Sequence, residues 1–334
     1  MKFLDMMLLN ILIMSTMITI SALNWFTMWL GLEINLLVFI PLITKSKNIY
    51  PAESALKYFL VQSLASSIFL FSIIMNLTYQ NMNFSELFNL IMNSAIFMKM
   101  GMAPFHYWFP QMIEGLNWNN SLILLTWQKI APMVLIMYNL KFSIMLTTVI
   151  ILSSIISSIQ GLNQNSFRKI MAYSSINHMA WMTCSMIFSS IWMIYFTIYS
   201  MISINIILIF KNFNIYKINQ LHNLNSFSLK LLLILNFFSL GGLPPFIGFL
   251  PKWLTILELM KWNMSLLAFI IIMFTLITLY FYIRIMLQAM MFFNMKKINL
   301  KKFKLPKLIL IFNILSLSMF LIFNISFFFI LNPL

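Results

Sequence analysis

The sequence has little charge: only 8% of its 334 residues are Asp, Glu, Lys or Arg, whereas 62% are hydrophobic. A soluble domain carries about 25% charged residues, so a soluble fold could not cover this much apolar surface. Long runs of Leu, Ile, Met and Phe raise the mean hydropathy to +0.93. These features exclude an ordinary soluble domain and predict a protein that is embedded in lipid.

Residues that hold redox cofactors, metals or phosphates are also scarce. Cys184 is the only cysteine, which excludes an internal disulfide and a thiolate set for zinc or an iron–sulfur cluster. The three histidines, His106, His178 and His222, lack the spacing of a metal site, and the seven glycines form no phosphate-binding loop. We therefore expect this chain to bind no cofactor and no metal.

Apolar stretches of about 20 residues, the length of a membrane-crossing helix, follow one another along the chain. None alternates with the period of two that a barrel strand needs. The sequence therefore predicts an all-α membrane protein, a single polytopic domain over 1–334, with the fourth and ninth helices broken. The eleven predicted helices cover 3–22, 25–43, 54–77, 84–113, 120–139, 143–161, 167–187, 190–210, 229–260, 265–291 and 306–331.

Positive charge is distributed unevenly between the two ends of these helices. Most cations fall in loops on the N-terminal side, and the other side has little beyond Lys141 and Lys261. By the positive-inside rule the N-terminal side faces the matrix or cytoplasm, and an odd number of helices places the C-terminus opposite. Topology thus explains much of the net charge of +15, and we expect no nucleic-acid partner. The N-terminal-side cations are Lys2, Lys45, Lys47, Arg168, Lys169, Lys211, Lys217, Lys230, Lys296, Lys297, Lys301, Lys302, Lys304 and Lys307.

One pattern recurs with an offset of 141 residues. GMAPFHYWFP (101–110) and GLPPFIGFLP (242–251) share G-x-x-P-F-x-x-x-x-P, and each interrupts an apolar helix. The copies lie five helices apart, so the units around them cross the membrane in opposite directions, as in transporters with inverted repeats. We predict an antiporter-like half at 25–139, an inverted half at 143–291 and a C-terminal helix at 306–331. Two proline kinks without a transport role are the alternative.

Four charged side chains stand within or beside apolar helices. Glu33 and Lys129 lie mid-span, Lys99 precedes the first break, and Lys252 follows the second. A charge at the centre of an isolated helix costs about 2.5–3.5 kcal/mol, so these residues should face the interior of the bundle. We predict a proton path through water from Glu33 to Lys99, Lys129 and Lys252. The alternative is a set of structural ion pairs and of side chains that extend their charge to the membrane surface.

Two further residues are weaker candidates for proton transfer. His178 lies mid-span, one turn after Ser174 and Ser175, and could either relay a proton or form a hydrogen bond in helix packing. Lys57 stands about one turn inside its helix and could equally extend its ammonium to the membrane surface.

Six motifs between residues 25 and 260 contain these charges and breaks: GLEINLLVFIPL, KYFLVQSLASS, MKMGMAPFHYWFP, LLTWQKIAPM, MAYSSINHMAWM and GGLPPFIGFLPKW. Together they resemble the antiporter-like membrane subunits of respiratory complex I, in particular the subunit-2 family of mitochondrial NADH dehydrogenase. The resemblance implies proton translocation driven by quinone reduction elsewhere in the complex. It matches the family's helix-borne glutamate to Glu33 and its three lysines to Lys99, Lys129 and Lys252.

The resemblance also implies a setting for the chain. FMN, iron–sulfur clusters and ubiquinone are expected in other subunits, in agreement with the single Cys184. The expected partners are the antiporter-like subunit 4, the small subunit 4L, accessory subunits and membrane phospholipids. The expected location is the mitochondrial inner membrane, with the N-terminus in the matrix and the C-terminus in the intermembrane space. Two alternatives stay open: an Mrp-type cation/proton antiporter subunit, and a structural membrane subunit without its own proton path.

Overall fold

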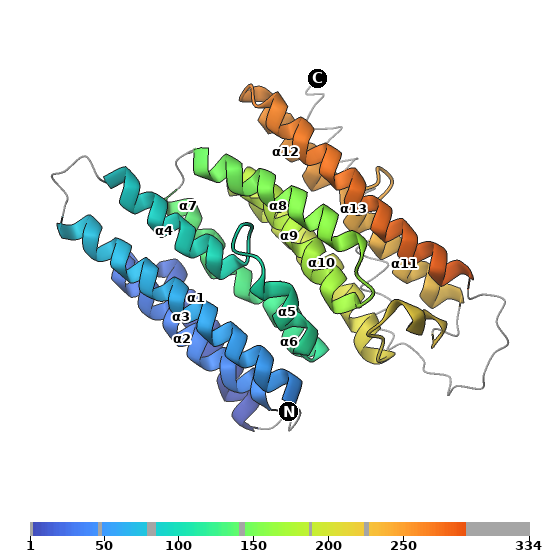
Figure 1. Ribbon diagram of the computed structural model, residues 1–334, viewed down its shortest axis with the longest axis horizontal. Coiled ribbons are helices and arrows are strands. Elements are labelled where there is room, and N and C mark those ends of the chain that lie inside the picture. The colour runs from blue at the N-terminus through green and yellow to red at the C-terminus, as the bar shows by residue number, and fades with distance from the viewer. Residues whose placement is uncertain are drawn as a thin grey trace, which may run out of the picture. The chain divides into compact units, whose positions relative to one another are not determined.

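The computed structural model describes residues 3–45, 49–78, 85–139, 144–186, 189–223 and 227–291, and every regular element in these ranges is a helix (Figure 1). This confirms the predicted all-α fold. The described helices fall into two compact units, Met1–Ser153 and Ser154–Leu334, whose boundary lies within one helix. The predicted helix at 306–331 lies outside the described residues.

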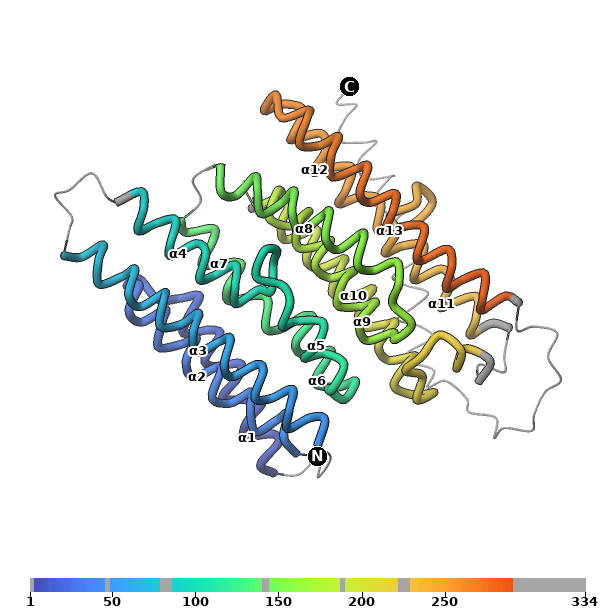
Figure 2. The backbone as a smooth tube through the Cα atoms, in the orientation of Figure 1, coloured from blue at the N-terminus to red at the C-terminus, as the bar shows by residue number. Residues whose placement is uncertain are grey.

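The helices of the first unit pack largely in sequence order. They are α1 (Phe3–Ser21), α2 (Trp25–Thr44), α3 (Ile49–Thr78), α4 (Ser85–Met100), α5 (Trp108–Gly115), α6 (Trp118–Leu125), η1 (Trp127–Lys129), α7 (Ile130–Tyr138) and the first part of α8 (Ile144–Leu162). α1 contacts α2, α2 contacts α3, and α3 contacts both α4 and α5 (Figure 2). Helix α3 therefore connects the N-terminal helices to the first break.

The described part of the second unit is built around one buried helix. Its elements are the rest of α8, α9 (Phe167–Ser185), α10 (Ser189–Asn212), η2 (Ile218–Asn223), α11 (Phe227–Gly241), α12 (Phe249–Lys261) and α13 (Ser265–Met291). Helix α9 contacts α10, α12 and α13, and nearly all its side chains are buried, although they include serines, an asparagine and a histidine. Buried polar groups need hydrogen-bond partners, so α9 forms the polar centre of this unit.

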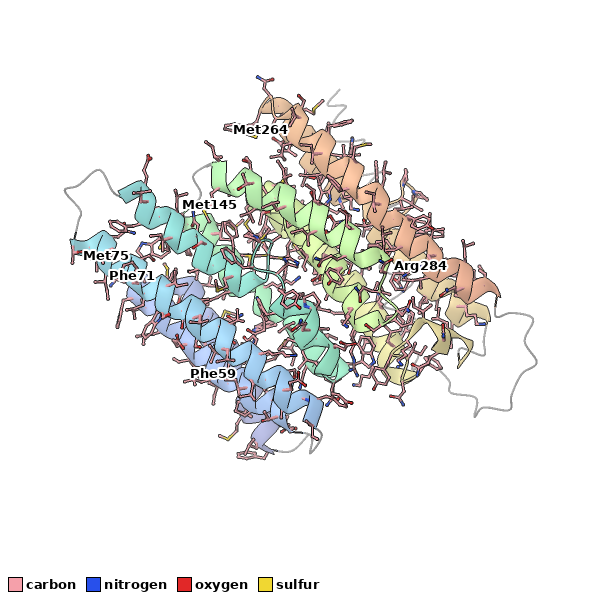
Figure 3. All side chains as sticks on the ribbon, in the orientation of Figure 1. Phe59, Phe71, Met75, Met145, Met264 and Arg284 are labelled. Carbon is pink, nitrogen blue, oxygen red and sulfur yellow. The ribbon has the colours of Figure 1, made fainter. Side chains whose placement is uncertain are left out.

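Seven helical segments of the described residues are long and apolar enough to cross a membrane. Their outer faces are apolar as well: Phe59 and Phe71, for example, project from α3 and are exposed (Figure 3). Such a surface is stable against lipid and unstable against water, as expected for a multi-pass membrane protein. The segments are Phe3–Ser21, Trp25–Ile43, Ile49–Thr78, Trp118–Tyr138, Ile144–Leu162, Ser190–Asn212 and Ser265–Met290.

The first predicted break begins with a glycine in the left-handed region. Gly101 follows α4 with a φ of +72°, a conformation that glycine adopts without the strain that a Cβ atom would cause. Its N–H donates to the carbonyl of Met98 at 3.1 Å, and the N–H of Met102 donates to the carbonyl of Phe97 at 3.1 Å. These two bonds form a Schellman motif, which ends a helix and satisfies two of its last carbonyls.

The second predicted break has the same motif. Gly242 follows α11 with a φ of +75°, its N–H donates to the carbonyl of Ser239, and the N–H of Leu243 donates to that of Phe238. In both breaks the next helix begins seven residues after the glycine. The repeat read from the sequence therefore extends to the way in which the two helices end.

A third interruption differs from the prediction. The sequence indicates one uninterrupted helix over 120–139, but α6 ends at Leu125 and the short η1 segment separates it from α7. Pro132 has no N–H to donate to the carbonyl of Gln128. The bond from the N–H of Lys129 to the carbonyl of Thr126 is long, at 3.4 Å. The expectation of a continuous helix was wrong, and Lys129, like Lys99 and Lys252, lies at or beside a break.

Candidate functional site

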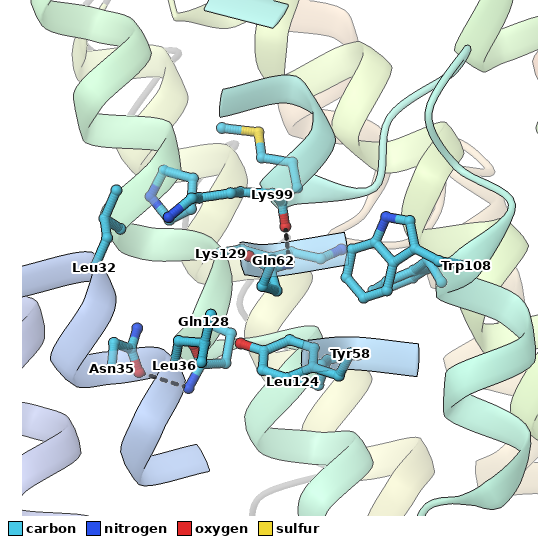
Figure 4. Close-up of a pocket in the computed structure, with 13 residues that line it drawn as sticks. Leu32, Asn35, Leu36, Tyr58, Gln62, Lys99, Trp108, Leu124, Gln128 and Lys129 are labelled. Atoms are coloured by element: carbon cyan, nitrogen blue, oxygen red, sulfur yellow. Dashed lines mark hydrogen bonds between the residues drawn. The ribbon is translucent and has the colours of Figure 1, made fainter. Parts of the chain in front are cut away.

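A cavity in the first unit brings the first break and the η1 segment together (Figure 4). The cavity has a volume of about 30 Å³. A cavity needs about 10–15 Å³ to hold one water, so about two waters fit. The cavity is lined by Leu32, Asn35, Leu36, Tyr58, Gln62, Lys99, Met100, Trp108, Phe109, Leu124, Gln128, Lys129 and Pro132.

Lys99 reaches the cavity from the last turn of α4 and is buried. Its backbone carbonyl lies at the end of the helix, where it accepts a hydrogen bond from Nε2 of Gln62 at 3.1 Å. The indole Nε1 of Trp108 donates to the carbonyl of Met98 at 3.2 Å. Neutral side chains from α3 and α5 thus cap α4, so this capping does not depend on the Lys99 ammonium.

Lys129 enters the same cavity from η1 and is only 3% exposed. Its Nζ lies 5.6 Å from the ring centroid of Phe109, within the range of a cation–π interaction. Because Lys99 also lines the cavity, two lysine side chains share a space with room for about two waters. The structure therefore brings together two of the predicted proton-carrying residues.

Glu33 lies beside this cavity rather than in its lining. It is half-buried on α2, and its neighbours Leu32 and Asn35 are lining residues. The carboxylate of Glu33 attracts the ammonium of Lys99 electrostatically. Lys99 thus interacts with the carboxylate and shares its cavity with Lys129.

Uncharged polar residues complete the cavity, and the sequence did not single them out. Asn35 and Gln128 are joined by a hydrogen bond, in which Nε2 of Gln128 donates to Oδ1 of Asn35 at 2.9 Å. Tyr58 and Gln62 are both buried on α3. In the sequence these four residues stand out only as polar side chains within apolar runs. Many residues that pack helices together show the same pattern.

Lys252 lies in the second unit and caps the second break. Its ammonium donates to the carbonyl of Gly241 at 2.9 Å and approaches that of Leu240 at 3.4 Å. These carbonyls end α11, where the helix dipole attracts a cation. The Lys252 Nζ also lies 6.0 Å from the ring centroid of Trp181. Lys252 therefore caps the helix that ends at the second break, as Gln62 caps the helix that ends at the first.

His178 lies on the buried α9 within a group of tyrosines. Its Nδ1 is 3.0 Å from the hydroxyl of Tyr195, and its ring lies 5.1 Å from that of Tyr199. The hydroxyls of Ser174 and Ser175, one turn earlier, donate to the backbone carbonyls of Met171 and Ala172 at 2.8 and 2.7 Å. The sequence did not indicate these tyrosines, because tyrosines in apolar spans more often mark the membrane surface.

Lys57 lies apart from the cavity. It forms an ion pair of 2.7 Å with Glu53, one turn earlier on α3, and its side chain is 37% exposed. An exposed ion pair of this kind contributes about 0–1 kcal/mol. We expect Lys57→Met to leave the proton yield per electron unchanged in liposomes containing the purified assembly. A clear loss of proton yield would place Lys57 in the path.

Metal-binding and thiol chemistry find no support in the described residues. No group of three or more His, Cys, Asp or Glu side chains in these ranges could hold a metal ion. Cys184 is a free, buried cysteine. The titratable groups of the site are carboxylate, amine and imidazole groups, which can take up and release protons.

The sequence matches known proteins over most of its length. A family model described as "NADH:quinone oxidoreductase/Mrp antiporter, TM" covers residues 22–278. The NADH-ubiquinone oxidoreductase chain 2 of Anopheles gambiae is 46% identical over 322 residues, which are 93% of this chain and 94% of that protein. The protein of the same name from Locusta migratoria is 40% identical, with 93% of each chain covered.

Solved structures share the fold at low sequence identity. A chain in respiratory complex I from Thermus thermophilus has a TM-score of 0.86 at 21% identity, and the match covers 97% of this chain and 79% of that one. A chain in the Mrp complex from a Dietzia species has a TM-score of 0.73 at 13% identity and covers 84% of this chain and 59% of that one. The antiporter-like fold is therefore common to both kinds of assembly, and the two relatives at 46% and 40% identity are oxidoreductase subunits.

Proposed function

The chain belongs to the NADH-ubiquinone oxidoreductase chain 2 family, and on that premise we propose which of its side chains carry protons. A member of this family is a membrane subunit of the oxidoreductase and translocates protons. We assign the transfer steps to Glu33, Lys99, Lys129 and Lys252, with His178 as an additional relay. Lys57 is left out because its ammonium is paired at an exposed position.

The observation that carries this proposal is the cavity shared by Lys99 and Lys129. The charge of Glu33 interacts with that of Lys99, and Lys99 shares the cavity with Lys129. In this proposal protons move between the two amines through the water for which the cavity has room. Low exposure of both lysines keeps bulk solvent from supplying protons at random.

In the second unit Lys252 receives and releases a proton at the end of α11. The carbonyls of Leu240 and Gly241 hold its ammonium in place. His178 and the hydroxyl of Tyr195 offer a second pair of groups that can exchange a proton. Redox chemistry takes place in other subunits, which we expect to bind FMN, iron–sulfur clusters and ubiquinone.

The remaining expectations are part of the same proposal. We place the chain in the mitochondrial inner membrane with its N-terminus in the matrix, on the basis of the lysine-rich loops of that side. Within its respiratory complex we expect contacts with the antiporter-like subunit 4, the small subunit 4L, accessory subunits and phospholipids. The halves 25–139 and 143–291 then form inverted repeats, as the two matching breaks suggest.

Glu33→Gln tests the proposal. The variant keeps the shape of the side chain but removes the charge that attracts Lys99, so we expect a several-fold lower proton yield per electron. The measurement is proton uptake against NADH oxidation by the purified complex in liposomes.

Glu86→Gln is the matched control, because Glu86 is exposed in the first turn of α4. We expect this variant to pump normally. Equal proton yields for wild type, Glu33→Gln and Glu86→Gln would support the structural alternative, in which the buried charges only hold the helices in place.

A further inference from the structure

We propose, on the basis of the function proposed above, that Asn35 and Gln128 form a positioning pair that holds Lys129 at the cavity. Neither residue titrates, so neither carries a proton itself. Their hydrogen bond joins α2, the helix of Glu33, to η1, the segment of Lys129. The pair therefore fixes how Lys129 lies relative to the other charged groups of the first unit.

The backbone around Lys129 needs such a contact. η1 is a single 3-10 turn, a tighter and weaker form of helix, and the bond from the N–H of Lys129 to the carbonyl of Thr126 is long at 3.4 Å. Pro132 cannot donate to the carbonyl of Gln128. These 3-10 bonds lie within η1 and its flanking residues, whereas the side-chain bond from Gln128 to Asn35 (2.9 Å) joins the segment to α2.

The position of the pair makes its effect specific to proton transfer. Gln128 directly precedes Lys129, and Asn35 follows Glu33 by two residues. Both amides line the cavity, as Lys129 does, and Figure 4 shows the hydrogen bond between them. A change in the length of this bridge therefore shifts Lys129 relative to Lys99 and to the space for water, while both lysines keep their charge.

The first unit also contains a matched control. Nδ2 of Asn139, at the end of α7, donates to Oδ1 of Asn93 on α4, and this bond is 2.9 Å long as well. Neither of these asparagines lines the cavity. Both pairs are interhelical amide bonds of equal length, so they should contribute similarly to stability, and only one of them should affect proton transfer.

Exchange variants test the positioning role without removing the amides. Asn35→Gln lengthens one arm of the bridge by one methylene, Gln128→Asn shortens the other, and the double variant restores the total length. We expect each single variant to lower the proton yield per electron several-fold in assembled complex, and the double variant to recover most of it. Such non-additivity is the mark of two side chains that act through one contact.

Asn93→Gln is the control, and we expect its proton yield to equal that of the wild type. Equal losses in Asn93→Gln and Asn35→Gln, or no recovery in the double variant, would overturn the positioning role. If Glu33→Gln lowers the yield and the Asn35 and Gln128 variants do not, only this inference fails. If none of these variants lowers the yield, the proposed function fails with it.

Discussion

Lys129→Met should abolish most of the proton transfer through this chain while leaving the complex assembled. Methionine fills a similar volume, but it can neither take up nor release a proton. The loss of one positioned acid–base group costs about 10²–10⁴-fold in the step that it serves. We therefore expect a loss on the order of 10²-fold in proton transfer through this chain, measured as proton uptake per electron in liposomes.

Assembly of the complex distinguishes a proton-carrying Lys129 from a Lys129 that only holds the helices in place. Its side chain is only 3% exposed, and burying a charge carries a desolvation cost that an apolar side chain of similar size does not have, so we expect Lys129→Met to assemble. A complex that assembles normally but does not pump therefore indicates a proton carrier. Lys261→Met is the control, because the Lys261 side chain is 68% exposed and paired with Glu258. If Lys129→Met pumped as well as Lys261→Met, Lys129 would have no part in the path.

The helices and both main breaks could be predicted because local chemistry determines them. Apolar runs of about 20 residues need lipid, and a glycine at positive φ followed by prolines ends a helix wherever it occurs. The G-x-x-P-F pattern at 101–105 and 242–246 therefore predicted both breaks and the similarity between them. The cost of a buried charge likewise pointed to Lys99, Lys129 and Lys252 without knowledge of their neighbours.

The rest of the site depends on contacts between distant segments, which one sequence does not encode visibly. Gln62 meets the carbonyl of Lys99 across 37 residues, and Gln128 meets Asn35 across 93. The interruption at η1 was missed for a related reason. Pro132 only allows it, since many transmembrane helices accommodate a proline as a simple kink, and the partner of Gln128 on α2 was not apparent from the sequence.

Lys252→Met should produce the second large effect, a loss of both assembly and proton transfer. The Lys252 ammonium donates to the carbonyl of Gly241 and approaches that of Leu240. Methionine leaves both carbonyls without this donor, and an unsatisfied buried polar group costs about 1–3 kcal/mol. We expect less assembled complex and faster thermal inactivation, measured on purified membranes, in addition to the loss of proton yield.

Lys252→Gln separates the two roles of Lys252, because the first unit already uses a glutamine in this way. The amide of Gln62 caps the carbonyl of Lys99 at the first break, so an amide at position 252 can cap α11 without carrying a proton. We expect Lys252→Gln to assemble better than Lys252→Met and to pump equally poorly. If Lys252→Gln pumped normally, Lys252 would be a cap alone. If both variants assembled equally badly, the size and charge of the lysine, rather than its hydrogen bonds, would hold the second break together.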